Sequence, residues 1–171
     1  MPVWDRFVRL FHWSIVALVL LAWSTTDGPR AVHEDAGYAV LVLVALRLAW
    51  GLMGTPYARF VGFVHRPRTV MRYLTALCEG RAPRYLGHNP AGGAMIVVLL
   101  TLLVVASGSG WMSQTDAWFG VPWVDRLHHV SSHLLIIMAG IHVAGVIVSS
   151  WLHRENLVLA MITGRKRQHS A

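Results

Sequence analysis

The chain of 171 residues contains a single cysteine, Cys78, and few charged side chains. One cysteine cannot form an internal disulfide, so the fold does not depend on a disulfide framework. Charged residues make up 13% of the chain, whereas soluble domains contain about 25%. Negatively charged residues are the scarcer kind, with 8 Asp and Glu against 15 Lys and Arg. Because 55% of the residues are hydrophobic, this composition indicates an integral membrane protein.

Four apolar stretches occupy most of the sequence, at roughly 8–25, 34–53, 92–112 and 129–151. Each is close to the roughly 20 residues that an α-helix needs to cross a bilayer. The first could be a signal peptide, but it lacks a small-residue cleavage site and carries His12, so we interpret it as a retained span. The sequence therefore predicts an all-α integral membrane four-helix bundle that forms a single domain over 1–171.

Basic residues are distributed unequally between the two predicted sides of the membrane. Twelve Lys and Arg residues fall on the side of the N-terminus, Arg30 and Arg126 fall on the other side, and Arg47 lies within a span. The positive-inside rule then predicts that both termini are cytoplasmic. It also explains the net charge of +7 without nucleic acid as a partner. In the long link at 54–91, residues 66–78 are expected to form a short helix on anionic lipid headgroups.

Four histidines in or beside the spans form two pairs of equal predicted depth. His128 and His142 are 14 residues apart, which places them on one helix face about 21 Å apart along the axis. His12 lies near the inner end of the first span, at the depth of His142. His33 lies at the outer start of the second span, at the depth of His128. Four unrelated polar histidines are the alternative, but matched depth favours two bis-histidine sites.

Two bis-histidine sites stacked in a helix bundle are the arrangement that holds two b-type haems. The sequence has no C-x-x-C-H motif, so such haems would be bound without covalent attachment. Imidazole at both axial positions suits electron transfer, because no position is left for oxygen. A zinc or copper site is less favoured because, apart from Glu34 and Asp35 at the start of the second span, the spans contain no carboxylates.

The remaining histidines are predicted to be polar contacts or solvated side chains. His129 and His133 point away from the face of His128 and His142, so we interpret them as polar contacts. The others lie in predicted loops or tails and are expected to be solvated: His65, His88, His153 and His169. Among these, His88 adjoins a capped helix start at the membrane surface, where a quinone head group could bind.

Two arginines are candidates for contacts with haem. Arg47 follows His33 by 14 residues and so lies on the same face, close to the inner histidine pair. A charge at that depth needs an anion, and a haem propionate and water at the nearby inner surface are equally good explanations. Arg9 precedes His12 by nearly one turn and is predicted to act in the same way.

The order and spacing of these motifs resemble bacterial cytochrome b561 and the b-type cytochrome subunit of nickel–iron hydrogenases. The resemblance covers almost the whole chain and rests, besides His128 and His142, on R-L-F-H-W at 9–13, H-E-D-A-G-Y at 33–38, R-L-A-W-G at 47–51, G-H-N-P-A-G-G at 87–93 and M-I-T-G-R at 161–165. It implies a four-helix core with two haems, whose ligands fall on His12, His33, His128 and His142.

The resemblance also implies an electron carrier in the bacterial cytoplasmic membrane. Such a carrier links a quinone pool with a periplasmic or membrane-bound redox partner, either a c-type cytochrome or a hydrogenase-like protein, and we expect a subunit rather than a stand-alone enzyme. A homodimer in the lipid bilayer is a further option. The alternatives are a haem-free small transporter or assembly subunit, and an oxidoreductase acting on superoxide or quinone.

Overall fold

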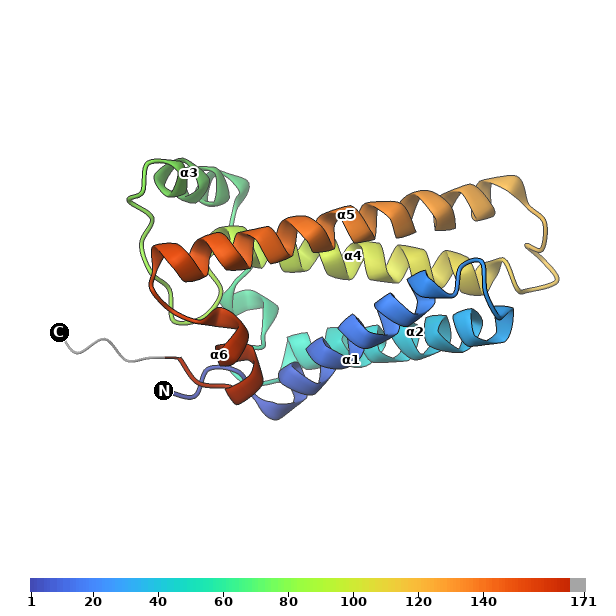
Figure 1. Cartoon of the computed structure of the whole chain (residues 1–171), viewed down its shortest axis with the longest axis horizontal. Helices are drawn as coiled ribbons and strands as arrows, with labels where there is room; N and C mark the ends of the chain where they lie inside the picture. The colour runs from blue at the N-terminus through green and yellow to red at the C-terminus, as the bar shows by residue number, and fades with distance from the viewer. Residues whose placement is uncertain (167–171) are drawn as a thin grey trace.

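The computed structural model describes residues 1–166, so Arg167 and His169 lie outside the described residues. Within this range the protein is all-helical and has four helices long and apolar enough to cross a membrane. These four run side by side along the long axis of the molecule (Figure 1). The elements are α1 (Arg6–Ser24), α2 (Arg30–Met53), η1 (Phe60–Gly62), α3 (Pro67–Cys78), α4 (Pro90–Met112), α5 (Pro122–Leu152) and α6 (Leu157–Thr163). The predicted four-span fold is confirmed.

Helix α5 begins earlier than predicted, at Pro122 rather than near 129. Proline suits the first turn of a helix because its missing N–H would have no partner there, and Asp125 places a negative charge at the positive end of the helix dipole. Helix α2 likewise begins at Arg30 rather than at 34. As a result, His33 and His128 both lie within regular helix, which fixes the direction of their side chains.

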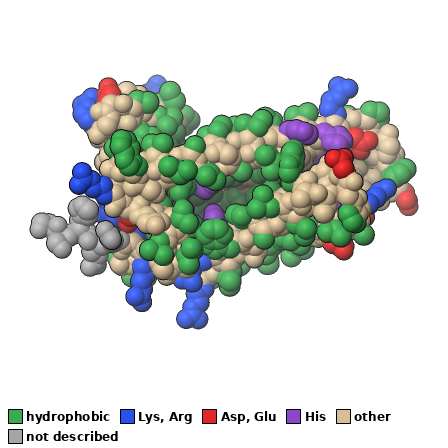
Figure 2. Space-filling model, viewed as in Figure 1, with side chains coloured by type: hydrophobic (Ala, Val, Ile, Leu, Met, Phe, Trp, Pro, Cys, Tyr) green, Lys and Arg blue, Asp and Glu red, His purple; other side chains and the backbone are tan. Residues whose placement is uncertain are grey.

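The four long helices pack in chain order around an open side. Helix α4 packs against α2 and α5, and α2 packs against α1. The buried core comes from three helices: Val40 and Val44 of α2, Leu100 and Leu103 of α4, and Leu135 of α5. No extended contact joins α1 to α5 among the described residues. Figure 2 shows a hollow between these two helices, with histidine side chains inside it.

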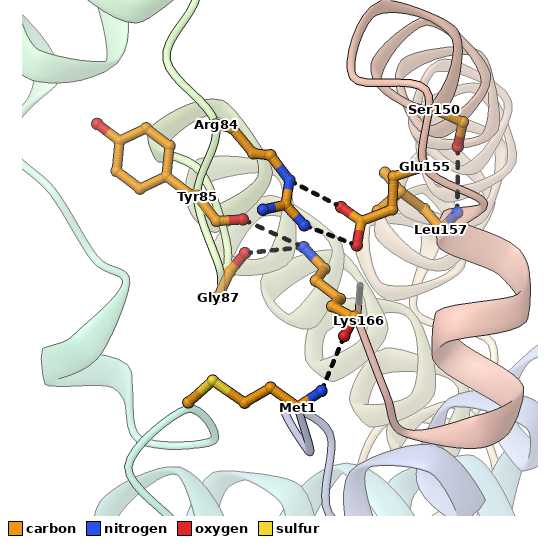
Figure 3. Close-up of polar contacts among 8 residues, drawn as sticks. All are labelled: Met1, Arg84, Tyr85, Gly87, Ser150, Glu155, Leu157 and Lys166. Atoms are coloured by element: carbon orange, nitrogen blue, oxygen red, sulfur yellow. Dashed lines mark hydrogen bonds and ion pairs between the residues drawn. The ribbon is translucent and has the colours of Figure 1, made fainter. Parts of the chain in front are cut away.

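The two ends of the described chain meet at one end of the bundle. The amino group of Met1 donates to the carbonyl of Lys166 at 2.9 Å. The Nζ of Lys166 in turn donates to the carbonyls of Tyr85 and Gly87, at 3.3 and 3.4 Å, in the link that precedes α4 (Figure 3). An even number of spans requires both ends on one side, and this arrangement agrees with that.

At the same end, the carboxylate of Asp5 joins α1 to α2. Its Oδ1 caps α1 by accepting from the Val8 N–H at 2.8 Å. Its Oδ2 accepts from the Thr55 hydroxyl at 2.6 Å and from the Trp50 indole at 3.1 Å. Burial alone would raise the pKa of Asp5, but the bonds from Thr55, Val8 and Trp50, helped by nearby Arg47, outweigh it and lower the pKa.

Replacing Asp5 by alanine is expected to lower the free energy of unfolding by about 2–3 kcal/mol, because the change removes a helix cap and leaves two donors without an acceptor. Thermal unfolding in detergent measures the effect, with Asp27→Ala, at an exposed position, as the control. Because the folded pKa lies below 3.8, the stabilisation is complete above that pH and is lost as the pH falls through the folded value. The difference in stability between the wild type and Asp5→Ala should therefore become smaller at low pH. Equal midpoints of thermal unfolding for the wild type and Asp5→Ala at pH 7 would contradict this role of Asp5.

Candidate functional site

The imidazoles of His33 and His128 face each other at the outer end of the bundle. Their ring centroids are 6.0 Å apart and their planes cross at 80°. The Nδ1 of His33 lies 2.8 Å from the carbonyl oxygen of Ala22, and the Nδ1 of His128 lies 2.9 Å from that of Ala106. A carbonyl oxygen can only accept, so each Nδ1 carries the proton in neutral imidazole. Each Nε2 therefore keeps its lone pair for a metal ion.

The separation of these rings fits a shared metal ion. Metal–imidazole bonds of about 2 Å on both sides require centroids roughly 6 Å apart, in agreement with the observed 6.0 Å. The ring of His128 can occupy this position because residue 110 is glycine. A Cβ atom at Gly110 would lie 3.0 Å from Nδ1 and 3.1 Å from Cε1 of His128. Gly110 and the carbonyls of Ala22 and Ala106 were not predicted from the sequence as parts of the site.

His12 and His142 lie on α1 and α5, the two helices that flank the hollow. They are close enough to interact electrostatically. The Nδ1 of His12 is buried and has no hydrogen-bond partner among the described residues. The outer pair is thus in contact with fixed tautomers, whereas the inner pair comes from the two helices that flank the hollow.

Arg47 is buried rather than extended to water, with only 3% of its surface exposed. Its Nη2 donates to the carbonyl of Ala58 at 3.1 Å, and its guanidinium lies 5.3 Å from the centre of the Phe60 ring. Arg9 donates from Nη1 to the carbonyl of Thr163, at the C-terminal end of α6, at 3.1 Å. Each arginine retains one buried nitrogen without a partner among residues 1–166, Nη1 of Arg47 and Nε of Arg9. Such orphaned donors are expected where a polar group of a ligand binds.

The prediction that His88 is solvated was wrong. Its ring packs between Trp4 and Phe63, at centroid distances of 4.4 and 4.8 Å, and its Nδ1 is buried without a partner among the described residues. Burial, with Lys166 and Arg47 nearby, lowers the pKa of His88 to about 3. The imidazole is therefore neutral at pH 7 and is a poor proton acceptor. Sequence reasoning missed this packing because its aromatic partners lie far away in the chain.

The other histidines mostly make local contacts. His133 packs edge-on against Trp23, with centroids 5.2 Å apart, and its Nδ1 lies 2.8 Å from the carbonyl oxygen of His129. This contact joins α5 to the outer end of α1, beside the hollow. His65 bonds to the carbonyl of Phe63 at 2.8 Å. The pKa of His153 is lowered, mainly by burial, so this side chain is also not fully solvated.

A four-span helical bundle with facing histidines and a hollow between its helices defines a class of membrane protein that can hold a prosthetic group between its spans. The chain belongs to the prokaryotic cytochrome b561 family, whose family model matches residues 3–164. It is therefore a multi-pass protein of the bacterial inner membrane and a b-type haem electron-transfer subunit.

Curated relatives are similar over nearly the full chain. A probable Ni/Fe-hydrogenase B-type cytochrome subunit from Rhodobacter capsulatus is 26% identical, over 96% of this chain and 80% of its own length. Proteins of the same name from Rhizobium leguminosarum bv. viciae and Cupriavidus necator are 21% and 22% identical, over 96% and 95% of this chain and 87% and 85% of their own lengths. No solved structure matches the chain significantly.

Proposed function

We propose that the protein carries electrons across the membrane through two non-covalently bound b-type haems. His33 and His128 would hold one of them, and His12 and His142 would hold the other. The observation that carries this proposal is the outer pair, whose rings lie 6.0 Å apart and whose Nδ1 atoms each bond to a backbone carbonyl, so that each Nε2 keeps its lone pair. The chain acts as one domain with both termini in the cytoplasm, which the meeting of its two ends supports.

When bound, haem supplies a reversible one-electron couple at its iron. The side chains provide the rest. The carbonyls of Ala22 and Ala106 accept from the Nδ1 atoms of His33 and His128 and so orient the two rings. The same hydrogen bonds make the Nε2 lone pairs more basic and therefore stronger metal ligands. Two imidazoles per site leave no position open to oxygen. At the inner end, Nη1 of Arg47 and Nε of Arg9 have no partner among residues 1–166 and would donate to the carboxylates of a haem.

We further propose that electrons pass between a quinone pool and a periplasmic or membrane-bound partner. The relatives are named as subunits of Ni/Fe-hydrogenases, so a hydrogenase is one candidate partner. A c-type cytochrome is another. His88 does not support the quinone link as a proton acceptor, because its pKa of about 3 keeps it neutral.

A transporter would need a polar path through the spans. Instead, the hydroxyls of Ser107, Ser109 and Ser131 donate to carbonyls of their own helices, at 2.6–2.7 Å, and so do not form such a path among the described residues. An outer site for superoxide would need free positive charge. Arg30, however, is bound to Glu34 at 2.5 Å and to Gln114 at 2.6 Å. Both alternatives are therefore weaker than electron transfer.

Proteoliposomes test the proposed function directly. With an oxidant trapped inside and a membrane-impermeant reductant outside, the haem-loaded protein should reduce the oxidant. His33→Gln should abolish this activity, whereas His129→Gln, which changes an exposed neighbour of the outer pair, should retain it. Equal rates with the wild type and His33→Gln would rule out a conduit through this residue.

Gly110 offers a test that changes no ligand. Gly110→Ala should loosen the outer haem about 10-fold or more, because the new methyl group displaces the His128 ring from its carbonyl partner. Gly108→Ala is a matched control on the same helix, since a Cβ there meets nothing within 4 Å. Haem retention during dilution in detergent measures the effect. If both variants lost haem equally, close packing of His128 on Gly110 would not be important.

A further inference from the structure

A groove lies where α5 turns into α6, at the end of the bundle that holds both chain ends (Figure 1). Its volume is about 450 Å³. Val146 and Ile147 from the last turns of α5 and Val158 from α6 form an apolar wall. Trp151, at the end of α5, and Arg154, in the turn that follows, also line the groove. The groove is separate from the hollow between α1 and α5.

The groove exposes positive charge and little negative charge. Glu155 also lines it, but this carboxylate is only 6% exposed and is held by Arg84, through Nη2 at 3.0 Å and Nε at 3.3 Å (Figure 3). Arg154 is exposed and has no ion-pair partner among the described residues. An anion is therefore the charge that this end of the groove would bind.

The surroundings of the groove indicate what carries the anion. Its apolar wall continues the surface of a membrane span, where hydrocarbon chains are the solvent. Trp151 is 82% exposed, as tryptophans at the membrane interface commonly are. An apolar wall that ends in a tryptophan and an arginine matches the chemistry of a phospholipid. An acyl chain would lie along the wall, and the phosphate would lie at Arg154. A free phosphate would leave the apolar wall uncovered.

We propose that this groove, formed by Val146, Ile147, Trp151, Arg154 and Val158, binds one anionic phospholipid. The lipid would lie against the α5–α6 turn and fasten α6 to the end of the span that carries His142. This proposal does not depend on haem binding. Such a site, made of one arginine and one apolar wall, differs from a general electrostatic attraction of the basic end of the bundle to an anionic membrane.

Native mass spectrometry of the haem-loaded protein in detergent tests the proposal, with dioleoyl phosphatidylglycerol and dioleoyl phosphatidylcholine as probes. The wild type should retain one phosphatidylglycerol in preference to phosphatidylcholine. Arg154→Gln should weaken phosphatidylglycerol binding about fivefold, the effect expected for one basic residue beside an anionic headgroup. Arg59→Gln, at an exposed position in the link between α2 and α3, should have little effect.

A second pair of variants tests the apolar wall. Val158 and Val148 are similarly exposed, at 49% and 48%, but only Val158 lines the groove. Val158→Trp should fill the groove and exclude the lipid, whereas Val148→Trp should not. The proposal is overturned if phosphatidylcholine binds equally well, if Arg59→Gln weakens binding as much as Arg154→Gln, or if Val158→Trp retains the lipid. Displacement by glycerol phosphate would also overturn it, since that would show a phosphate site without a need for lipid.

Discussion

Replacing His33 by glutamine is expected to reduce the haem content from two per chain to one. Glutamine keeps a polar side chain at this position but is a poor haem ligand. His128→Gln should cause the same loss, because the two rings face each other across 6.0 Å and hold one group between them. The double variant should lose no more than either single variant, since residues that act on one site are not additive. Haem per chain and reduced visible spectra measure these outcomes.

The neighbouring histidines provide controls on the same helix. His129 and His133 are exposed, and His133 bonds within α5 and packs on Trp23. His129→Gln and His133→Gln should therefore retain both haems. The assignment of the outer pair would be wrong if His33→Gln and His128→Gln removed spectrally different haems, or if the double variant lost both.

Replacing Arg47 by glutamine is expected to have two separable effects. The free energy of unfolding should fall by about 2 kcal/mol, because the charged hydrogen bond from Arg47 to the buried Ala58 carbonyl is lost. The reduction potential of the inner haem should also fall, by roughly 60 mV or more, since loss of a positive charge disfavours the reduced form and 59 mV corresponds to a tenfold change for one electron. The outer haem should keep its potential.

Thermal unfolding and a redox titration distinguish the two effects. Arg59→Gln is the control, because Arg59 lies in the same link but is exposed. A loss of stability without a change in potential would show that Arg47 only joins α2 to the link near Ala58 and Phe60. Its unpaired Nη1 would then not contact a haem propionate.

The sequence predicted the features that depend on the bilayer and on helix periodicity. Four apolar stretches long enough to cross a bilayer had to be helices, because unpaired backbone groups cannot lie in hydrocarbon. The spacing of His128 and His142 placed them on one face of a helix whose period is fixed. The meeting of His33 with His128 follows from their equal depth near the outer starts of two spans that run in the same direction. Each of these inferences used only local sequence and the thickness of a membrane.

The features that were missed depend on partners far away in the chain. Asp5 meets Trp50 and Thr55, which are 45 and 50 residues away, and neither has a sequence signal that identifies Asp5. The carbonyls that orient His33 and His128 belong to alanines, whose side chains carry no information about hydrogen bonding. The short helix α6 and the packing of His88 against Trp4 arise where the two chain ends meet. Such contacts become visible only when the fold is known.

The most direct test of the account is the number of haems on the purified wild-type protein. Spectra of the oxidised and dithionite-reduced protein in mild detergent, with haem quantified per chain, should show two non-covalent b-type haems. That result would support both histidine pairs, the outer pair of His33 and His128 and the inner pair of His12 and His142. A single haem would contradict one of the two sites. A colourless protein from haem-replete cells that takes up no added haem would contradict the proposed electron-transfer function as a whole.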